Sequence, residues 1–177
     1  MINIAKDGII EESTIDGEGV RLVVFTQGCS HHCKGCHNPS TWEFNDKNKI
    51  SDTEILDMVH SNPLLDGITL SGGDPFFQAK NCINLCKIIK KEDLTVWAYT
   101  GFIFDEFIKF KNKVKCDDRI NKDMLNLLKY VDVVVDGPFI IEQRTLDSKY
   151  RGSTNQRLID VKKSLHQNKI VEYQLKI

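Results

Sequence analysis

The sequence predicts one α/β domain with a mostly parallel sheet. Along the 177 residues, short apolar runs alternate with longer amphipathic segments. Strands separated by helices imply right-handed β-α-β crossovers, which place the strands parallel in one sheet. No internal repeat and no linker rich in proline, glycine or serine divides the chain. We therefore expect residues 1–177 to form a single domain, since a chain of this length buries a proper core.

Five short apolar runs are the expected strands. Residues 21–26 (RLVVFT) form a nearly continuous β-branched run, which is typical of a strand covered on both faces. The other expected strands are residues 67–70, 94–99, 131–135 and 157–161.

The segments between these runs are expected to be helices. The first begins at Ser51, where Ser51 and Glu54 have the spacing of a capping box ahead of an apolar stripe. Residues 76–90 carry apolar side chains at helical spacing. Shorter helices are expected through residues 104–108 and 124–128.

Polar and glycine-rich loops follow four of the expected strands. A cysteine-rich loop follows the first strand, and the later strands lead into residues 71–75 (SGGDP), 100–101 (TG) and 136–139 (DGPF). The carboxyl ends of parallel strands meet at one edge of a sheet, which is where α/β proteins bind ligands. The sequence therefore predicts one site lined by four loops.

Composition and charge are those of an ordinary soluble protein. Apolar residues make up 41% of the chain and charged residues 28%, which is typical of globular domains. A net charge of −1 argues against a nucleic-acid-binding surface, which is normally basic. The acidic start lacks the apolar run of a signal peptide, and no run approaches the length of a membrane span. We expect a cytoplasmic protein that binds neither nucleic acid nor a membrane.

Six cysteines in a reducing compartment indicate metal ligands and buried thiols rather than disulfides. Cys29, Cys33 and Cys36 have the spacing C-x3-C-x2-C on one loop. Three soft thiolates suit a four-iron cluster, in which they would hold three irons and leave the fourth open. An open coordination position is typical of a reactive metal centre.

Zinc is the strongest rival for this loop. His31, His32 and His37 are available as a fourth ligand, and zinc sites with three cysteines and one histidine are common. Structural zinc sites, however, usually draw their ligands from two separated knuckles, and no second pair follows downstream. We therefore favour the iron–sulfur interpretation and place the histidines beside the cluster, not on it.

The remaining cysteines are expected to have no metal role. Cys82 and Cys86 lie four residues apart on the apolar face of an expected helix, where cysteine behaves as a small hydrophobe. An extra metal pair is the alternative for these two. Cys116 has no nearby partner. Without a second cluster in the chain, a reducing electron has to come from another protein.

The cysteine spacing followed by SGGDP resembles the radical S-adenosylmethionine enzymes. Further segments resemble, in order, the activating proteins of anaerobic ribonucleoside-triphosphate reductase, and together they span residues 16–160. These segments are DGEGVRLVVFTQGCSHHCKGCHNPSTW, SGGDP, WAYTG, VDVVVDGPF and YRGSTNQRLID. The cysteine spacing is specific to the superfamily, whereas GSTNQR and STW suggest this particular branch.

The resemblance implies an incomplete parallel (β/α) barrel and a defined chemistry. Cys29, Cys33 and Cys36 would bind the cluster, and S-adenosylmethionine would chelate the open iron through its amino and carboxylate groups. An electron from a donor such as flavodoxin or ferredoxin would cleave the sulfonium. The resulting 5′-deoxyadenosyl radical would take a hydrogen atom from a glycine of the reductase's glycyl-radical subunit. No catalytic residue is expected beyond the cluster and the cofactor.

The resemblance also implies contacts to S-adenosylmethionine. Gly35, Cys36 and His37 would lie along the adenosyl group, mainly through their backbone. The superfamily often has an aromatic residue before the third cysteine, so Gly35 removes a stacking surface there.

A second set of contacts would come from the loops after the second and fourth expected strands. Gly72, Gly73 and Asp74 would receive the methionyl amino group, because glycines allow close backbone approach and a carboxylate suits an ammonium-like partner. Asp74 stands where the superfamily often has Glu. For Asp136 two roles stay open, a contact to the cofactor or a cap for the following turn.

Two alternative functions also stay open. One is an activase for another glycyl-radical enzyme, such as pyruvate formate-lyase. The other is a non-catalytic iron–sulfur or zinc module. The polar stretch around Arg144, Arg151 and Arg157 is either a solvated loop or a docking surface for the reductase.

Overall fold

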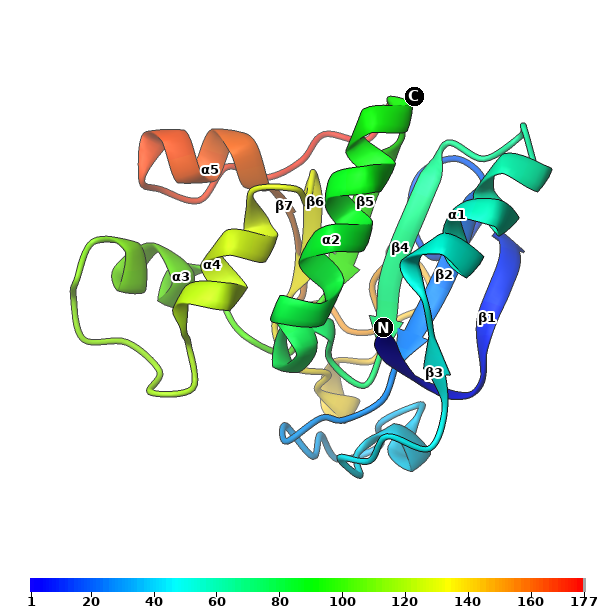
Figure 1. Cartoon of the computed structure of the whole chain (residues 1–177). Coiled ribbons are helices and arrows are strands. Elements are labelled where there is room, and N and C mark those ends of the chain that lie inside the picture. Colours follow the sequence, from blue (N-terminus) through cyan, green and yellow to red (C-terminus); the bar gives the residue numbers. More distant parts are fainter. Residues whose placement is uncertain (177) are drawn as a thin grey trace.

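The computed structural model describes residues 1–176, which form one seven-stranded mixed sheet (Figure 1). The strand order is β3-β1-β2-β4-β5-β6-β7, and β2, β4, β5 and β6 run parallel to one another. β1 pairs antiparallel with both β2 and β3, and β7 pairs antiparallel with β6. The bounds are β1 Ile2–Ser13, β2 Arg21–Thr26, β3 Lys49–Ile50, β4 Gly67–Gly72, β5 Thr95–Tyr99, β6 Val133–Asp136 and β7 Arg157–Asp160.

The four central strands confirm the expected α/β class with a mostly parallel sheet. β7 is present where a fifth strand was expected, but it runs antiparallel to β6. The sheet is open in the described part of the chain, with β3 and β7 at its edges, so the barrel itself is not confirmed. β1 was not expected, because charged residues interrupt its apolar positions and its pairing with β2 slips between Ile4 and Ile9.

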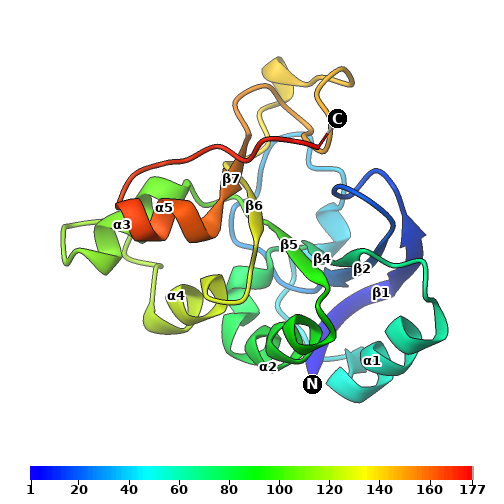
Figure 2. The same cartoon turned by 90° about the horizontal axis from the view of Figure 1, so that it is seen from above.

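Helices cover one side of the sheet, and long loops lie on the other (Figure 2). The helices are α1 Asp52–Ser61, α2 Ala79–Ile89, α3 Phe104–Lys111, α4 Lys122–Leu128 and α5 Val161–Gln167. The capping box of α1 is confirmed, because the Ser51 side chain accepts from the Glu54 amide and the Glu54 carboxylate accepts from the Ser51 amide. No helix within residues 1–176 is long and apolar enough to span a membrane.

A fully buried arginine braces the face of the sheet that turns away from the helices. Arg21 Nε donates to Thr69 Oγ1 at 2.8 Å, and its Nη1 donates to Thr95 Oγ1 at 2.9 Å and to the Glu18 carbonyl at 3.1 Å. The guanidinium carbon lies 5.6 Å from the centre of the Trp97 ring. Burial lowers the pKa of Arg21 to about 10, so the side chain stays charged at neutral pH. Arg21 therefore links β2, β4 and β5 near the amino ends of these strands.

We expect Arg21→Met to lower the free energy of unfolding by on the order of 3 kcal/mol, because it leaves buried hydroxyl and carbonyl acceptors without a donor. The measurement is urea denaturation of the cluster-free protein, with Lys162→Met on the exposed face of α5 as the matched loss of a cation. Equal midpoints for the two variants would contradict a bracing role for Arg21.

Candidate functional site

The loops after the four parallel strands meet at the carboxyl ends of these strands, at the lower end of the sheet in Figure 1. They line a cavity of about 790 Å³. This arrangement agrees with the expectation of one site built from four loops. The lining residues from these loops include Cys29, Cys33, Cys36, His37, Gly72, Gly73, Thr100, Gly101, Gly137 and Phe139.

The cysteine loop brings its three free thiols to this cavity. Cys29 is buried, whereas Cys33 and Cys36 are half-buried. The loop is closed at its base by a hydrogen bond of 3.1 Å from the Cys29 amide to the Trp42 carbonyl. Burial raises the pKa of the Cys29 thiol to about 11 and also raises the pKa of Cys33. Metal binding has to displace these protons, since the thiolate is the ligand.

The donor set fits a cluster in this cavity. Within residues 1–176, no three His, Cys, Asp or Glu side chains converge closely enough to hold a single metal ion. The three thiols instead line a common cavity, and in a four-iron cluster each thiolate binds its own iron. Trp42 and Arg151 also line the cavity, and their Nε1 and Nε atoms are buried without a hydrogen-bond partner.

The glycines of the SGGDP loop allow it to lie directly against the end of β2 and the start of the cysteine loop. A Cβ atom at Gly72, where φ is +95°, would lie 2.5 Å from the Thr26 amide nitrogen, and one at Gly73 would lie 2.5 Å from the Gly28 carbonyl oxygen. The Gly73 amide donates to the Thr26 carbonyl at 2.7 Å. Both glycines line the cavity beside the cysteines.

Asp74 is buried beneath this loop, with only 1% of the residue exposed. Its Oδ2 accepts from Thr100 Oγ1 at 2.8 Å and from the Gly101 amide at 3.0 Å, and it lies 2.9 Å from His31 Nε2. Its Oδ1 accepts from the Phe76 amide at 2.9 Å. Protein donors thus occupy both oxygens, and Asp74 is not among the residues that line the cavity. Its contact to a methionyl amine stays a prediction.

Asp136 is also buried and bonded within the protein. It accepts from the Phe104 amide at 2.7 Å, at the start of α3, and from Arg157 Nε at 3.1 Å. The hydrogen bond from Arg157 raises the pKa of that guanidinium, which also pairs with Asp105 at 2.8 Å. Asp136 therefore caps α3, an element distant in sequence, and its contact to a cofactor stays a prediction.

The remaining expected cofactor residues lie on the cysteine loop. Cys36 and the exposed His37 line the cavity, and the His37 ring lies 4.9 Å from the Phe139 ring. Gly35, where φ is +76°, is exposed and faces Ile141 rather than the cavity lining.

Two segments line the cavity that the sequence did not assign to it. Residues 14–16 follow β1, and residues 144–152 form the loop before β7. Ile15 is 78% exposed and Leu146 is 89% exposed. The polar stretch that begins with Tyr150 was a signal for the second segment, whereas the first was missed together with β1.

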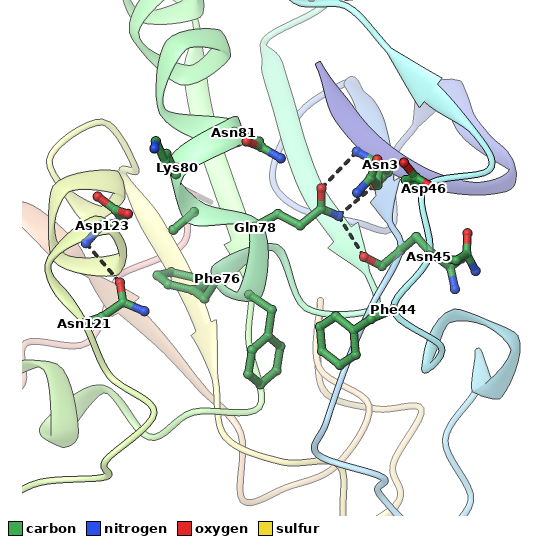
Figure 3. A pocket seen from close by; sticks show the side chains of 13 residues that line it. Asn3, Phe44, Asn45, Asp46, Phe76, Gln78, Lys80, Asn81, Asn121 and Asp123 are labelled. Atoms are coloured by element: carbon green, nitrogen blue, oxygen red, sulfur yellow. Dashed lines mark hydrogen bonds between the residues drawn. The ribbon is translucent and has the colours of Figure 1, made fainter.

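A second pocket, of about 480 Å³, is lined by Asn3, by residues 44–46 and by residues 76–81 at the start of α2 (Figure 3). Gln78 anchors it, because its Nε2 donates to the carbonyls of Asn3 and Gln27, each at 2.8 Å. Phe44 and Phe77 also line this pocket, with their rings 5.6 Å apart, and the Phe77 ring lies 5.3 Å from the His31 ring. An aromatic layer therefore separates this pocket from the cysteine-lined cavity.

The comparisons with known proteins agree with this geometry. Residues 15–159 match the family model described as a 4Fe-4S single cluster domain. The anaerobic ribonucleoside-triphosphate reductase-activating protein of Haemophilus influenzae is 34% identical over 152 residues, which cover 80% of this chain and 88% of that protein. The chain belongs to the family of anaerobic ribonucleoside-triphosphate reductase-activating proteins.

Other relatives carry the same name. The protein of Vibrio cholerae is 34% identical over 150 residues, covering 80% of this chain and 88% of its own, and that of Enterobacteria phage T4 is 32% identical over 152 residues, covering 81% and 86%. Among solved structures, QueE from Escherichia coli has a TM-score of 0.44 and 15% identity, over 76% of this chain and 68% of that chain, which is too low to support an argument.

Membership of this family confirms the family expected from the sequence and the expectation of a radical S-adenosylmethionine enzyme. The family model also supports a four-iron cluster. None of the relatives named above supports the alternatives of a pyruvate formate-lyase activase or a zinc module.

Two cysteines outside the cysteine loop, Cys82 and Cys86, are buried free thiols, as expected from the sequence. Both are fully buried on α2, within the main apolar core. Burial raises the pKa of Cys82 to about 12 and raises that of Cys86 well above its ordinary value. Cys116 is half-buried on the loop between α3 and α4.

We expect iodoacetamide at pH 8 to label Cys82 and Cys86 at least about tenfold more slowly than Cys36 in the folded, cluster-free protein, because each unit of pKa lowers the thiolate fraction about tenfold. Peptide mass spectrometry measures the rates, and urea-unfolded protein is the control in which all thiols should react. Equal rates in the folded protein would contradict the burial of the α2 thiols.

Proposed function

We propose that Cys29, Cys33 and Cys36 bind a four-iron cluster with one open iron, at which S-adenosylmethionine is cleaved to activate anaerobic ribonucleoside-triphosphate reductase. The observation that carries the proposal is the placement of all three cysteines on one cavity with the glycines of the SGGDP loop. When bound, the reduced cluster supplies one electron and S-adenosylmethionine yields methionine and a 5′-deoxyadenosyl radical, which removes a hydrogen atom from a glycine of the reductase.

The chain's own residues hold and orient these groups. The backbone of Gly72 and Gly73 forms the wall nearest the cysteines and is assigned to the methionyl end of the cofactor. The backbone of Gly35, Cys36 and His37 is assigned to the adenosyl end. We assign Asp74 and Asp136 an indirect role in cofactor binding. Their carboxylates accept hydrogen bonds from protein donors and so hold the loops that line the cavity.

The target glycine needs a way into the cavity. The sheet does not close on itself in the described part of the chain, because its end strands β3 and β7 are not paired with each other. Exposed Ile15 and Leu146, together with Arg144 and Lys149, lie where a segment of the reductase would enter. We assign the polar 144–152 loop to contact with the reductase for this reason.

The electron comes from outside the chain in this proposal. The sequence has no second cysteine cluster, which supports a separate donor such as flavodoxin or ferredoxin. A cytoplasmic location is proposed with it, because free thiols persist in that compartment.

The decisive experiment uses anaerobically reconstituted protein that is reduced and mixed with S-adenosylmethionine and the reductase. We expect 5′-deoxyadenosine by chromatography and a glycyl radical on the reductase by electron paramagnetic resonance. Cys33→Ala should abolish both signals, because it removes one thiolate from the cluster. The matched control is Cys116→Ala, which removes a thiol outside the cavity and should keep both signals.

The outcomes separate the parts of the proposal. Deoxyadenosine without a glycyl radical would retain the cleavage of S-adenosylmethionine and overturn the partner. Absence of both signals, from protein with a verified four-iron cluster, would overturn the proposed activity.

A further inference from the structure

His31 lies between two of the cluster cysteines in sequence and lines the same cavity, and its ring also contacts the buried Asp74. Its Nε2 lies 2.9 Å from Asp74 Oδ2, and only 7% of the His31 side chain and 1% of the Asp74 side chain are exposed. The neighbouring His32 is exposed instead. We propose that His31 is a positioning residue that, through Asp74, fixes the cysteine loop against the cofactor loops; the inference rests on the function proposed above.

Asp74 connects His31 to two further loops. The same Oδ2 atom accepts from Thr100 Oγ1 and from the Gly101 amide, in the loop after β5, while Oδ1 accepts from the amide of Phe76. One carboxylate therefore joins the loops that follow β2, β4 and β5. A buried carboxylate with several charge-assisted hydrogen bonds holds its partners tightly, since an unpaired buried charge is costly.

The position of His31 on the loop makes the contact specific. Backbone hydrogen bonds tie the base of the loop to the SGGDP segment, including one of 3.1 Å from the Asp74 amide to the Gly28 carbonyl. Within residues 1–176, His31 is the one buried side chain between 29 and 37 that is hydrogen-bonded to another loop; the Lys34–Glu142 ion pair is exposed. The His31 contact thus sets where the Cys29 and Cys33 thiols stand relative to Gly72 and Gly73.

Two aromatic rings and Gly101 pack against the His31 ring. The His31 ring lies 5.3 Å from the Phe77 ring and 4.6 Å from the Phe102 ring, which it meets edge-on. A Cβ atom at Gly101 would lie 2.6 Å from the ring. A carboxylate can only accept a hydrogen bond, so a hydrogen bond between Nε2 and Asp74 Oδ2 requires the His31 proton on Nε2.

The test compares variants that separate the shape of His31 from its hydrogen bond. His31→Phe keeps the ring and removes the donor, whereas His31→Gln keeps a donor at a similar reach. His166→Phe, on the exposed face of α5, is the matched control. We expect His31→Phe to bind as much iron as the wild type. Its dissociation constant for S-adenosylmethionine should rise about tenfold, which corresponds to a loss of about 1.4 kcal/mol of binding free energy. His31→Gln should recover most of the affinity, and His166→Phe should not change it.

A second readout does not depend on the cluster or the cofactor. In cluster-free protein, His31→Phe should raise amide hydrogen exchange severalfold in residues 29–37, while His31→Gln and His166→Phe should not. If the wild type fails to bind S-adenosylmethionine, the proposed function fails, and this exchange measurement still decides the role of His31 in holding the loop.

Three results would overturn the inference. One is unchanged exchange and unchanged affinity in His31→Phe. Another is loss of iron from folded His31→Phe to the extent seen in Cys33→Ala, which would make His31 a ligand. If His31→Phe does not fold, Gly101→Ala decides, because its added Cβ displaces the His31 ring while keeping the Gly101 amide. Wild-type affinity and exchange in Gly101→Ala would then overturn the inference.

Discussion

The buried carboxylate of Asp74 is the interaction on which the arrangement of the site depends. It accepts hydrogen bonds from two side chains and two backbone amides that come from three different loops. A carboxylate removed from water is stable only if such donors replace the lost solvent. The Asp74 carboxylate therefore holds its donors in place, and the loops that carry these donors are joined to one another at the carboxyl ends of the strands.

The two faces and the two ends of the sheet differ in what they contact. One face packs against the helices and forms the main apolar core. The opposite face is braced near the amino ends of the strands by Arg21, which bonds to β4 and β5. The carboxyl ends are thus left to the glycine and cysteine loops. Close contact here depends on Gly72 and Gly73, because a side chain at Gly72 would collide with the backbone at the end of β2 and one at Gly73 with the backbone of Gly28.

The site combines an open cavity with buried supports. Thiols and glycine backbone line the cavity, whereas Asp74 after β4 and Asp136 at the end of β6 do not line it and bind protein donors. Such an arrangement suits chemistry that depends on holding reacting groups in place, since it needs fixed geometry more than proton transfer. The rim is different, because it carries exposed apolar side chains on loops after β1 and before β7.

The sequence by itself determined the parallel core of the sheet, the capping box of α1, the three-cysteine loop and the family. Each of these depends on local signals: continuous apolar runs, a three-residue capping spacing, and a short motif. Tertiary structure alone decided β1 and β3, the antiparallel direction of β7, and the partners of Asp74 and Asp136. Strand β1, which lies between β3 and β2, mixes charged and apolar residues around a break near Asp7, where φ is 56°, so it lacks a clear period. The direction of a strand and the partner of a buried carboxylate depend on residues far along the chain, such as His31 for Asp74, and no local pattern encodes them.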